Sequence, residues 1–222
     1  MRHRLSWRAS ESHGYRDWGS RVPDLPPIYI GENGRFPDIF YATKQALPSA
    51  TTAIVYSWDG IGFLYDKESS VDVEKHVAGG GGPAYEEGKA IIADKPTLLF
   101  ICFNEPDATG HNIGWGTPEY QQMLTKIDGF IGKLLDDIEA AGIADDTVVI
   151  FTANHGGSGQ GHGGPVMEHM ETPYLIYGKG VKPGEITDSI VCYDLAPTIA
   201  WILGLKQPQP WRGQPTKSAF GM

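Results

Sequence analysis

Cysteine is scarce in this sequence, with only two among 222 residues, so no disulfide framework can support the fold. Cys102 and Cys192 both lie in apolar stretches, where we expect a free thiol to be buried. Long hydrophobic runs are missing too, since the longest, Leu98 to Phe103, falls far short of the roughly 20 residues that span a bilayer. The basic start MRHRLSWRAS lacks the apolar core of about 7 residues that a signal peptide needs. We therefore expect neither a membrane span nor a signal peptide in this chain.

Positive charge is also in deficit. Lys and Arg total 18 against 27 Asp and Glu, which gives a net charge of −9 and argues against a surface that coats nucleic acid. The length fits one globular domain, and 41% hydrophobic residues are enough to build a core.

Short apolar segments rich in β-branched or aromatic residues predict buried strands. These segments are Ala53 to Ser57, Thr97 to Phe103, Thr147 to Thr152 and Tyr174 to Tyr177. Between the second and the third, a single apolar stripe predicts a helix that begins near Thr117-Pro118-Glu119 and ends at Gly142. Strand, amphipathic helix and strand together predict a right-handed βαβ unit in a parallel sheet, so the fold class is α/β.

Further helices are predicted at Asp38 to Leu47, Tyr85 to Ala93 and Leu195 to Leu203. The glycine run Gly79 to Gly82, followed by Pro83, predicts a flexible turn. It is no phosphate-binding loop, because no Lys and Ser/Thr follow the glycines.

Metal-ligating side chains follow two of the predicted strands. After Thr97 to Phe103 comes a segment in which Asp107 and His111 are four residues apart, so one turn can aim both at the same cation. After the strand ending at Thr152 come Asn154 and His155, and then a segment with six glycines that surround His162. Any one of these residues alone could simply cap a turn. Together, oxygen and nitrogen ligands without a thiolate suit Zn²⁺, Mn²⁺ or Fe.

The pattern D-x-x-G-H after one strand, [D/N]-H-G-G after the next, and a later His resembles the alkaline phosphatase superfamily, in particular its type I phosphodiesterase/nucleotide pyrophosphatase branch. The resemblance extends over nearly the whole chain. The segment Glu11 to Tyr15 is similar to the one that follows the family's nucleophile helix, and Tyr193 to Ala200 is similar to its Asp-x-x-Pro-Thr helix.

This resemblance implies an alkaline phosphatase-like core, with a mostly parallel sheet and helices on both faces. Residues 1–222 would form one partial catalytic domain, with residues 1–10 as an unstructured tail. The implied activity is metal-dependent hydrolysis of a small-molecule phosphate ester through a covalent intermediate. Two divalent metals would serve it, with Zn²⁺ expected and Mn²⁺ as the alternative.

The resemblance also implies the ligand sets. Asp107, His111 and a later His would hold one metal, and we favour His162 over His169, whose surroundings predict a helical turn before Pro173. Asn154 and His155 would hold the second metal, together with an Asp from an earlier strand and a Ser or Thr nucleophile.

Two departures from the family bear on activity. Asn154 stands where the family has Asp, and a neutral amide is a weaker ligand, so we expect an impaired second site. The family's first strand and nucleophile precede the segment that Glu11 to Tyr15 resembles, and Ser6 and Ser10 lie too close to it to match the nucleophile. Asp59 resembles the first-strand ligand motif, but its position in the chain matches a non-ligand segment.

We interpret the chain as an N-terminally shortened member without the first strand and nucleophile helix, and we assign no catalytic residue. A longer form would be periplasmic or secreted, since relatives are often exported. The alternative is a non-catalytic metal-binding remnant. Two further alternatives are relatives of sulfatases and of phosphosugar mutases. A sulfatase would need C/S-x-P-x-R, which the segments at Cys102 and Cys192 do not match. The mutases share the metal motifs but carry a large inserted domain, for which this chain has little room.

Overall fold

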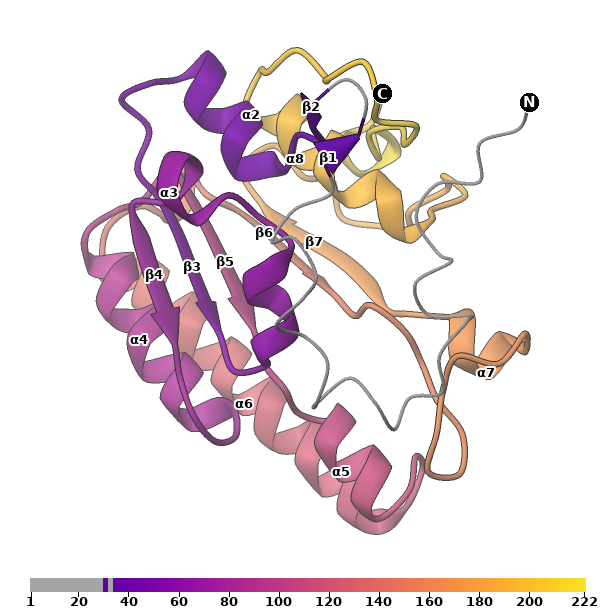
Figure 1. Cartoon of the computed structure of the whole chain (residues 1–222). Helices are drawn as coiled ribbons and strands as arrows, with labels where there is room; N and C mark the ends of the chain where they lie inside the picture. Colours follow the sequence, from indigo (N-terminus) through magenta and orange to yellow (C-terminus); the bar gives the residue numbers. More distant parts are fainter. Residues whose placement is uncertain (1–29, 32–33) are drawn as a thin grey trace.

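The computed structural model describes residues 30–31 and 34–222 (Figure 1). The expected tail at residues 1–10, the two serines Ser6 and Ser10, and the segment Glu11 to Tyr15 lie outside the described residues. The helices are α2 (Ile39–Ala46), α3 (Lys67–Ser70), α4 (Gly81–Ala93), α5 (Asp107–Asn112), α6 (Pro118–Ala140), α7 (Met167–Met170) and α8 (Leu195–Ile202). The strands are β1 (Ile30–Gly31), β2 (Gly34–Arg35), β3 (Thr52–Tyr56), β4 (Val73–His76), β5 (Leu98–Cys102), β6 (Val148–Thr152) and β7 (Tyr174–Gly178).

Strand β3 forms the centre of a three-stranded parallel sheet with the order β4-β3-β5. Every residue of β3 is buried, because each of its faces has its own apolar cover. Ile54 packs with Phe40 of α2 on one face of the sheet, while Val55 packs with Ala84 of α4 on the other face. This arrangement confirms the α/β class and the helices on both faces of the sheet.

Helix α6 has the ends that its sequence predicts. The Thr117 side chain accepts a hydrogen bond from the backbone N–H of Tyr120, and Pro118 occupies the first helical position, where its missing N–H costs nothing. The helix ends at Ala140, and Gly142 then adopts a φ of 69°, a left-handed conformation that favours glycine.

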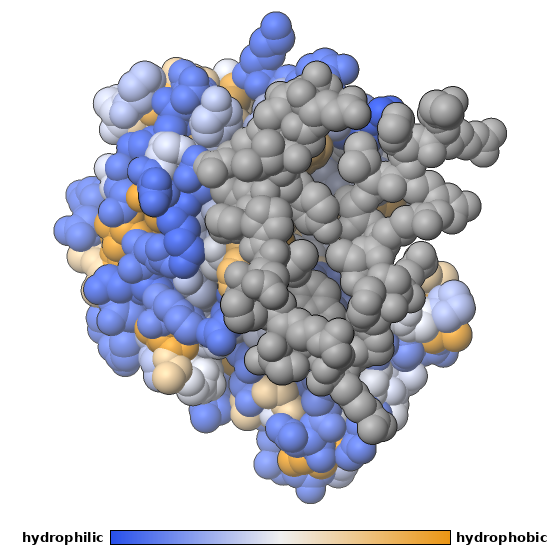
Figure 2. Space-filling model, in the orientation of Figure 1, coloured by the Kyte–Doolittle hydropathy of each residue, from blue (hydrophilic) through white to orange (hydrophobic). Residues whose placement is uncertain are grey.

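The glycine run is not the flexible turn that we predicted, because α4 begins at Gly81. A Cβ on Gly81 would lie 2.8 Å from Ile127 of α6, so this glycine lets the two helices approach closely. Pro83 stands in the first helical turn, where a backbone N–H has no partner within the helix anyway. Figure 2 shows that the outer surface over α3 and α4 is mainly hydrophilic, with small hydrophobic patches.

The predicted βαβ unit does not close into one hydrogen-bonded sheet. Among the described residues, β5 pairs only with β3, and β6 pairs antiparallel with β7, from Val148 opposite Gly178 to Thr152 opposite Tyr174. Two strands that are joined by a helix need not pair with each other, since strands that are consecutive in sequence are neighbours in space only about two-thirds of the time. Both strands are accordingly half-buried rather than buried as predicted.

The predicted Asp-x-x-Pro-Thr helix is α8, and the aspartate anchors the chain around it. Asp194 is buried, and its carboxylate accepts hydrogen bonds from the backbone N–H groups of Val191 at 2.9 Å and Gln214 at 2.7 Å. Cys192, expected to be buried, is exposed, because it lies in a short 3-10 turn rather than in a strand. None of the described helices combines the length and the apolar composition that a membrane span requires.

Candidate metal centre

Helix α5 presents Asp107 and His111 on the same face. The carboxylate of Glu105 caps this short helix by accepting hydrogen bonds from the backbone N–H and the hydroxyl of Thr109, at 3.0 and 2.8 Å. Residues four apart on a helix are neighbours. The Oδ1 atom of Asp107 therefore lies 3.6 Å from Nε2 of His111.

The loop that joins β6 to β7, residues 153–173, brings two more histidines to the same carboxylate oxygen. Nε2 of His155 lies 3.7 Å from Asp107 Oδ1, and Nε2 of His162 lies 3.8 Å from it. The two imidazole rings stack with centroids 3.6 Å apart. Asp107, His111 and His162 each offer one ligand atom, and these three atoms lie within 4.8 Å of one another.

Hydrogen bonds on the far side of two rings determine which nitrogen carries the proton. Nδ1 of His111 lies 3.1 Å from the carbonyl oxygen of Gln160, and Nδ1 of His155 lies 2.9 Å from that of Gly156. A carbonyl only accepts, so both Nδ1 atoms are protonated donors. Outer hydrogen bonds of this kind orient the rings of metal-binding histidines, and here they turn both Nε2 atoms toward Asp107.

The centre of this cluster fits a cation better than a hydrogen bond. Asp107 Oδ1 is shielded from solvent and accepts no hydrogen bond from the described residues. The distances of 3.6 to 3.8 Å to the three histidines exceed hydrogen-bond length. Four tetrahedral ligands with bonds of about 2.0–2.1 Å to one metal would lie about 3.4 Å apart. The spacing is therefore close to that of ligands around a common ion.

Burial keeps His162 neutral. Its side chain is 8% exposed, and burial, reinforced by His155, His111 and His169, lowers its pKa to about 4. Only the neutral imidazole has a lone pair to offer a metal. His162 is therefore ready to ligate at neutral pH without losing a proton.

His169, the alternative to His162, lies on α7 and has both ring nitrogens engaged elsewhere. Nδ1 accepts a hydrogen bond from the backbone N–H of Gly164 at 2.8 Å, so the proton is on Nε2, which donates to the Ser158 hydroxyl at 2.8 Å. This tautomer makes Ser158 an acceptor, so His169 does not activate it as a nucleophile. His169 instead braces the glycine-rich loop, and its short helix confirms the predicted helical turn.

The remaining predicted ligands do not join the cluster in the same way. The Asn154 side chain is exposed, and the backbone carbonyl oxygen of Asn154 lies 3.9 Å from the Cys192 thiol. His155, predicted beside Asn154 in a second site, faces Asp107 together with His162. Asp59 Oδ1 lies 2.9 Å from Nε2 of His76.

Trp115 is the residue near this cluster that the motifs did not identify. Its indole lies edge-on to the His111 ring, with centroids 5.0 Å apart. The available signal was its place four residues after His111, between two glycines, Gly114 and Gly116, that both adopt positive φ.

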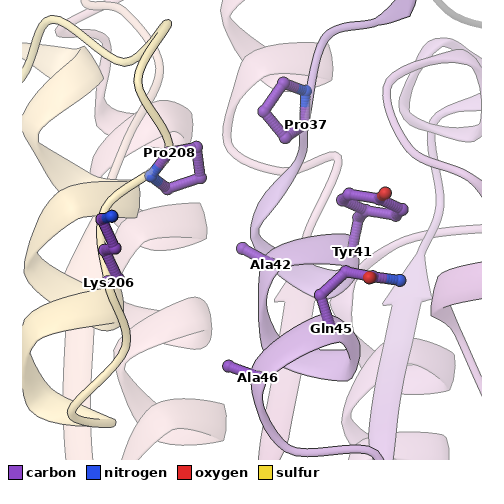
Figure 3. Close-up of a pocket in the computed structure, with 7 residues that line it drawn as sticks. All are labelled: Pro37, Tyr41, Ala42, Gln45, Ala46, Lys206 and Pro208. Carbon is purple, nitrogen blue, oxygen red and sulfur yellow. The ribbon is translucent and has the colours of Figure 1, made fainter.

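A cavity of about 330 Å³ lies away from the cluster, between α2 and the segment that follows α8 (Figure 3). Pro37 and Pro208 face each other across it, and Tyr41 and Lys206 add polar groups to a mostly apolar lining. None of the predicted ligands lines this cavity.

Comparison with known proteins brings one family forward. The type I phosphodiesterase/nucleotide pyrophosphatase family matches residues 20–162, a span that contains the whole cluster. The chain is 32% identical over 97 residues to the low-salt glycan biosynthesis sulfotransferase Agl7 of Haloferax volcanii. It is also 32% identical over 68 residues to mouse ectonucleotide pyrophosphatase/phosphodiesterase family member 7.

These alignments cover 39% and 31% of the chain, but only 24% and 16% of the two relatives. The fold is similar to that of a protein in the alkaline phosphatase superfamily from Vibrio parahaemolyticus, with a TM-score of 0.58 and 16% identity. That match covers 78% of this chain and 49% of the other.

Proposed function

Because the chain belongs to the type I phosphodiesterase/nucleotide pyrophosphatase family, we propose that it is a metal-dependent hydrolase of small-molecule phosphate esters. Membership of this family supports a hydrolase of phosphate or sulfate esters, and the metal dependence of this chain is part of our proposal. The finer assignment to phosphate esters, and the residues below, are our proposal.

One observation carries the proposal. The ligand atoms of Asp107, His111 and His162 converge within 4.8 Å of one another, and the Asp107 Oδ1 atom is shielded from solvent and accepts no hydrogen bond from the described residues. Asp107, His111 and His162 would be the ligands, with His155 within reach of the same ion. Imidazole nitrogens together with a carboxylate oxygen suit Zn²⁺, with Mn²⁺ as the alternative.

The residues of the chain have separate roles in this centre. A divalent cation would supply Lewis-acid stabilisation of the charge that develops on a phosphoryl oxygen. Asp107 would neutralise one charge of that ion, while the carbonyl groups of Gln160 and Gly156 hold the rings of His111 and His155 in the ligating orientation.

We further propose that a second metal binds weakly. Asn154 offers a neutral amide in place of a carboxylate, which is a weaker ligand for a cation. Its side chain is exposed, whereas the ring of His155 faces Asp107 instead. Metal analysis after dialysis should therefore give about one equivalent of tightly bound ion. Two equivalents that resist dialysis would contradict this part of the proposal.

A second candidate function is metal binding without hydrolysis. The observation that favours it is the tautomer of His169, whose Nε2–H donates to the Ser158 hydroxyl. Ser158 lies between His155 and His162 in sequence, and this tautomer leaves its hydroxyl without a general base.

Activity measurements distinguish the two functions. Because no nucleophile is assigned in this chain, its hydrolysis of bis-p-nitrophenyl phosphate should be slow. It should still exceed the hydrolysis of p-nitrophenyl sulfate, stop when a chelator is added and return with Zn²⁺. His111→Ala should abolish the turnover, whereas Asp136→Asn, a change at an exposed position of α6, should not. Zinc binding without turnover would support the second candidate. Turnover that survives both chelation and His111→Ala would overturn the proposed function.

A further inference from the structure

Trp115 lies between the two segments that carry the proposed ligands. A Cβ added to Gly110, the residue before His111, would lie 2.6 Å from the indole. A Cβ added to Gly157, two residues after His155, would lie 2.7 Å from the indole Nε1. Real Cβ atoms do not come this close to other atoms, so both positions must be glycine for the indole to fit.

The indole also contacts a ligand from each segment. Its ring lies 5.0 Å from the His111 ring at 87° and 5.9 Å from the His162 ring at 73°, both edge-to-face arrangements. These contacts place one rigid side chain against α5 and against the glycine-rich loop at once.

The backbone of Trp115 fixes the same junction. Its N–H donates to the carbonyl oxygen of Gly159 at 2.8 Å, and its ring packs 6.0 Å from Tyr120 in the first turn of α6. In Figure 1 the segment after α5 and the loop before α7 accordingly lie at the same end of the molecule. Trp115 therefore joins the helix, the loop and the start of α6.

We propose that Trp115 is a positioning residue that sets the separation between Asp107 and His111 on α5 and the histidines of the loop, and thereby the affinity of the metal centre. The indole has a donor and no acceptor, so it acts without being a ligand itself. This inference rests on the proposed metal site. Replacing a residue that orients the metal ligands without binding the metal itself typically lowers the metal affinity about 10- to 100-fold.

The test is a titration with Co²⁺, whose d–d absorption reports the geometry of its ligands. The variants are Trp115→Ala, Trp115→Phe and Gly157→Ala, which pushes on the indole from the loop side. Trp58→Ala is the matched control, because Trp58 is 41% exposed and its ring lies over Gly60. Circular dichroism and thermal unfolding in the presence of a chelator establish that each variant is folded.

We expect Trp115→Ala and Gly157→Ala to weaken Co²⁺ binding at least about 10-fold and to change the absorption band. Trp115→Phe should weaken it less, and Trp58→Ala should leave it unchanged. If Trp115→Ala does not fold, Trp115→Phe and Gly157→Ala still decide the question. Folded Trp115 and Gly157 variants with wild-type affinity and an unchanged spectrum would overturn the positioning role alone. Failure of the wild-type chain to bind Co²⁺, with His111→Ala indistinguishable from it, would overturn the proposed function and this inference together.

Discussion

Replacing Asp107 with asparagine should stabilise the metal-free chain and destabilise the chain in zinc relative to wild type. In the metal-free state the Asp107 Oδ1 atom is shielded from solvent, accepts no hydrogen bond from the described residues and lies 3.7 Å from Nε2 of His155. An asparagine amide can donate to this Nε2 atom, and a hydrogen bond of this kind is worth about 0.5–1.5 kcal/mol. For a chain of this size, each kcal/mol raises the melting temperature by about 2–4 °C.

Zinc should reverse the order of the two proteins. An ion that binds only the folded state at about 100 times its dissociation constant stabilises it by about 2.7 kcal/mol. Asp107→Asn removes the one negative ligand of the cluster, so this variant should gain much less from the same zinc concentration. The assay is thermal unfolding of both proteins in excess chelator and in excess Zn²⁺, with the exposed Asp136→Asn as the control for a lost charge.

The two melting curves should therefore cross between the conditions. A variant that is less stable than wild type in chelator would show that Asp107 is already satisfied without a metal. A variant that gains as much from zinc as wild type would show that this carboxylate is not a ligand. Either result would refute the reasoning that leads from the acceptor cluster to a metal.

Three further predictions concern stability and use urea unfolding as the measurement. Gly142→Ala should lower the free energy of unfolding by about 1–2 kcal/mol, because the glycine has a positive φ. Gly178→Ala should lower it further, because Gly178 also has a positive φ (117°) and its added Cβ would press on the carbonyl oxygen of Thr147. Equal losses for the two variants would contradict this. Asp194→Ala should cost about 1–3 kcal/mol for each of the two backbone N–H groups it leaves unpaired, and a cost below that range would mean that water replaces the carboxylate. The hydrogen bond from Lys44, with the N–H that begins β3, lowers the pKa of Asp72 below its ordinary 3.8, so its stabilisation is present above that pH and is lost as the pH falls through the lowered pKa. Asp72→Asn should therefore be less stable than wild type at about pH 7, and the difference should shrink as the pH falls below 3.8. A difference that does not change with pH would exclude the ion pair as its cause.

Elements with local signals could be predicted from the sequence. Helix α6 follows from the Thr117 cap, the proline after it and a single apolar stripe, and the structure confirms both of its ends to within a few residues. The glycine run before Pro83 gave the wrong prediction, because the reason for Gly81 is a side chain of α6 that is far away in sequence. Local preference cannot report a helix–helix approach of this kind.

Sheet topology and the outer parts of the centre depended on tertiary contacts. The resemblance to the family implied Asp107, His111 and His162 as one set of ligands, and their ligand atoms lie within 4.8 Å of one another. It did not indicate that His155 would turn toward the same carboxylate, since that depends on how the loop folds over α5. The role of Gly157 was equally hidden, because the ring that occupies its missing side-chain volume comes from Trp115, which belongs to another segment.

The loop between β6 and β7 is anchored at both ends by one strand pair, with Thr152 opposite Tyr174. Loops closed by a hairpin can be lengthened or replaced at a small entropic cost, since the closure term grows only slowly with loop length. The whole loop, with its histidines and glycines, could therefore be replaced as a unit while the strand pair that anchors it is kept. The strand register would hold each exchanged loop over α5, whose ligands Asp107 and His111 lie outside the exchanged segment.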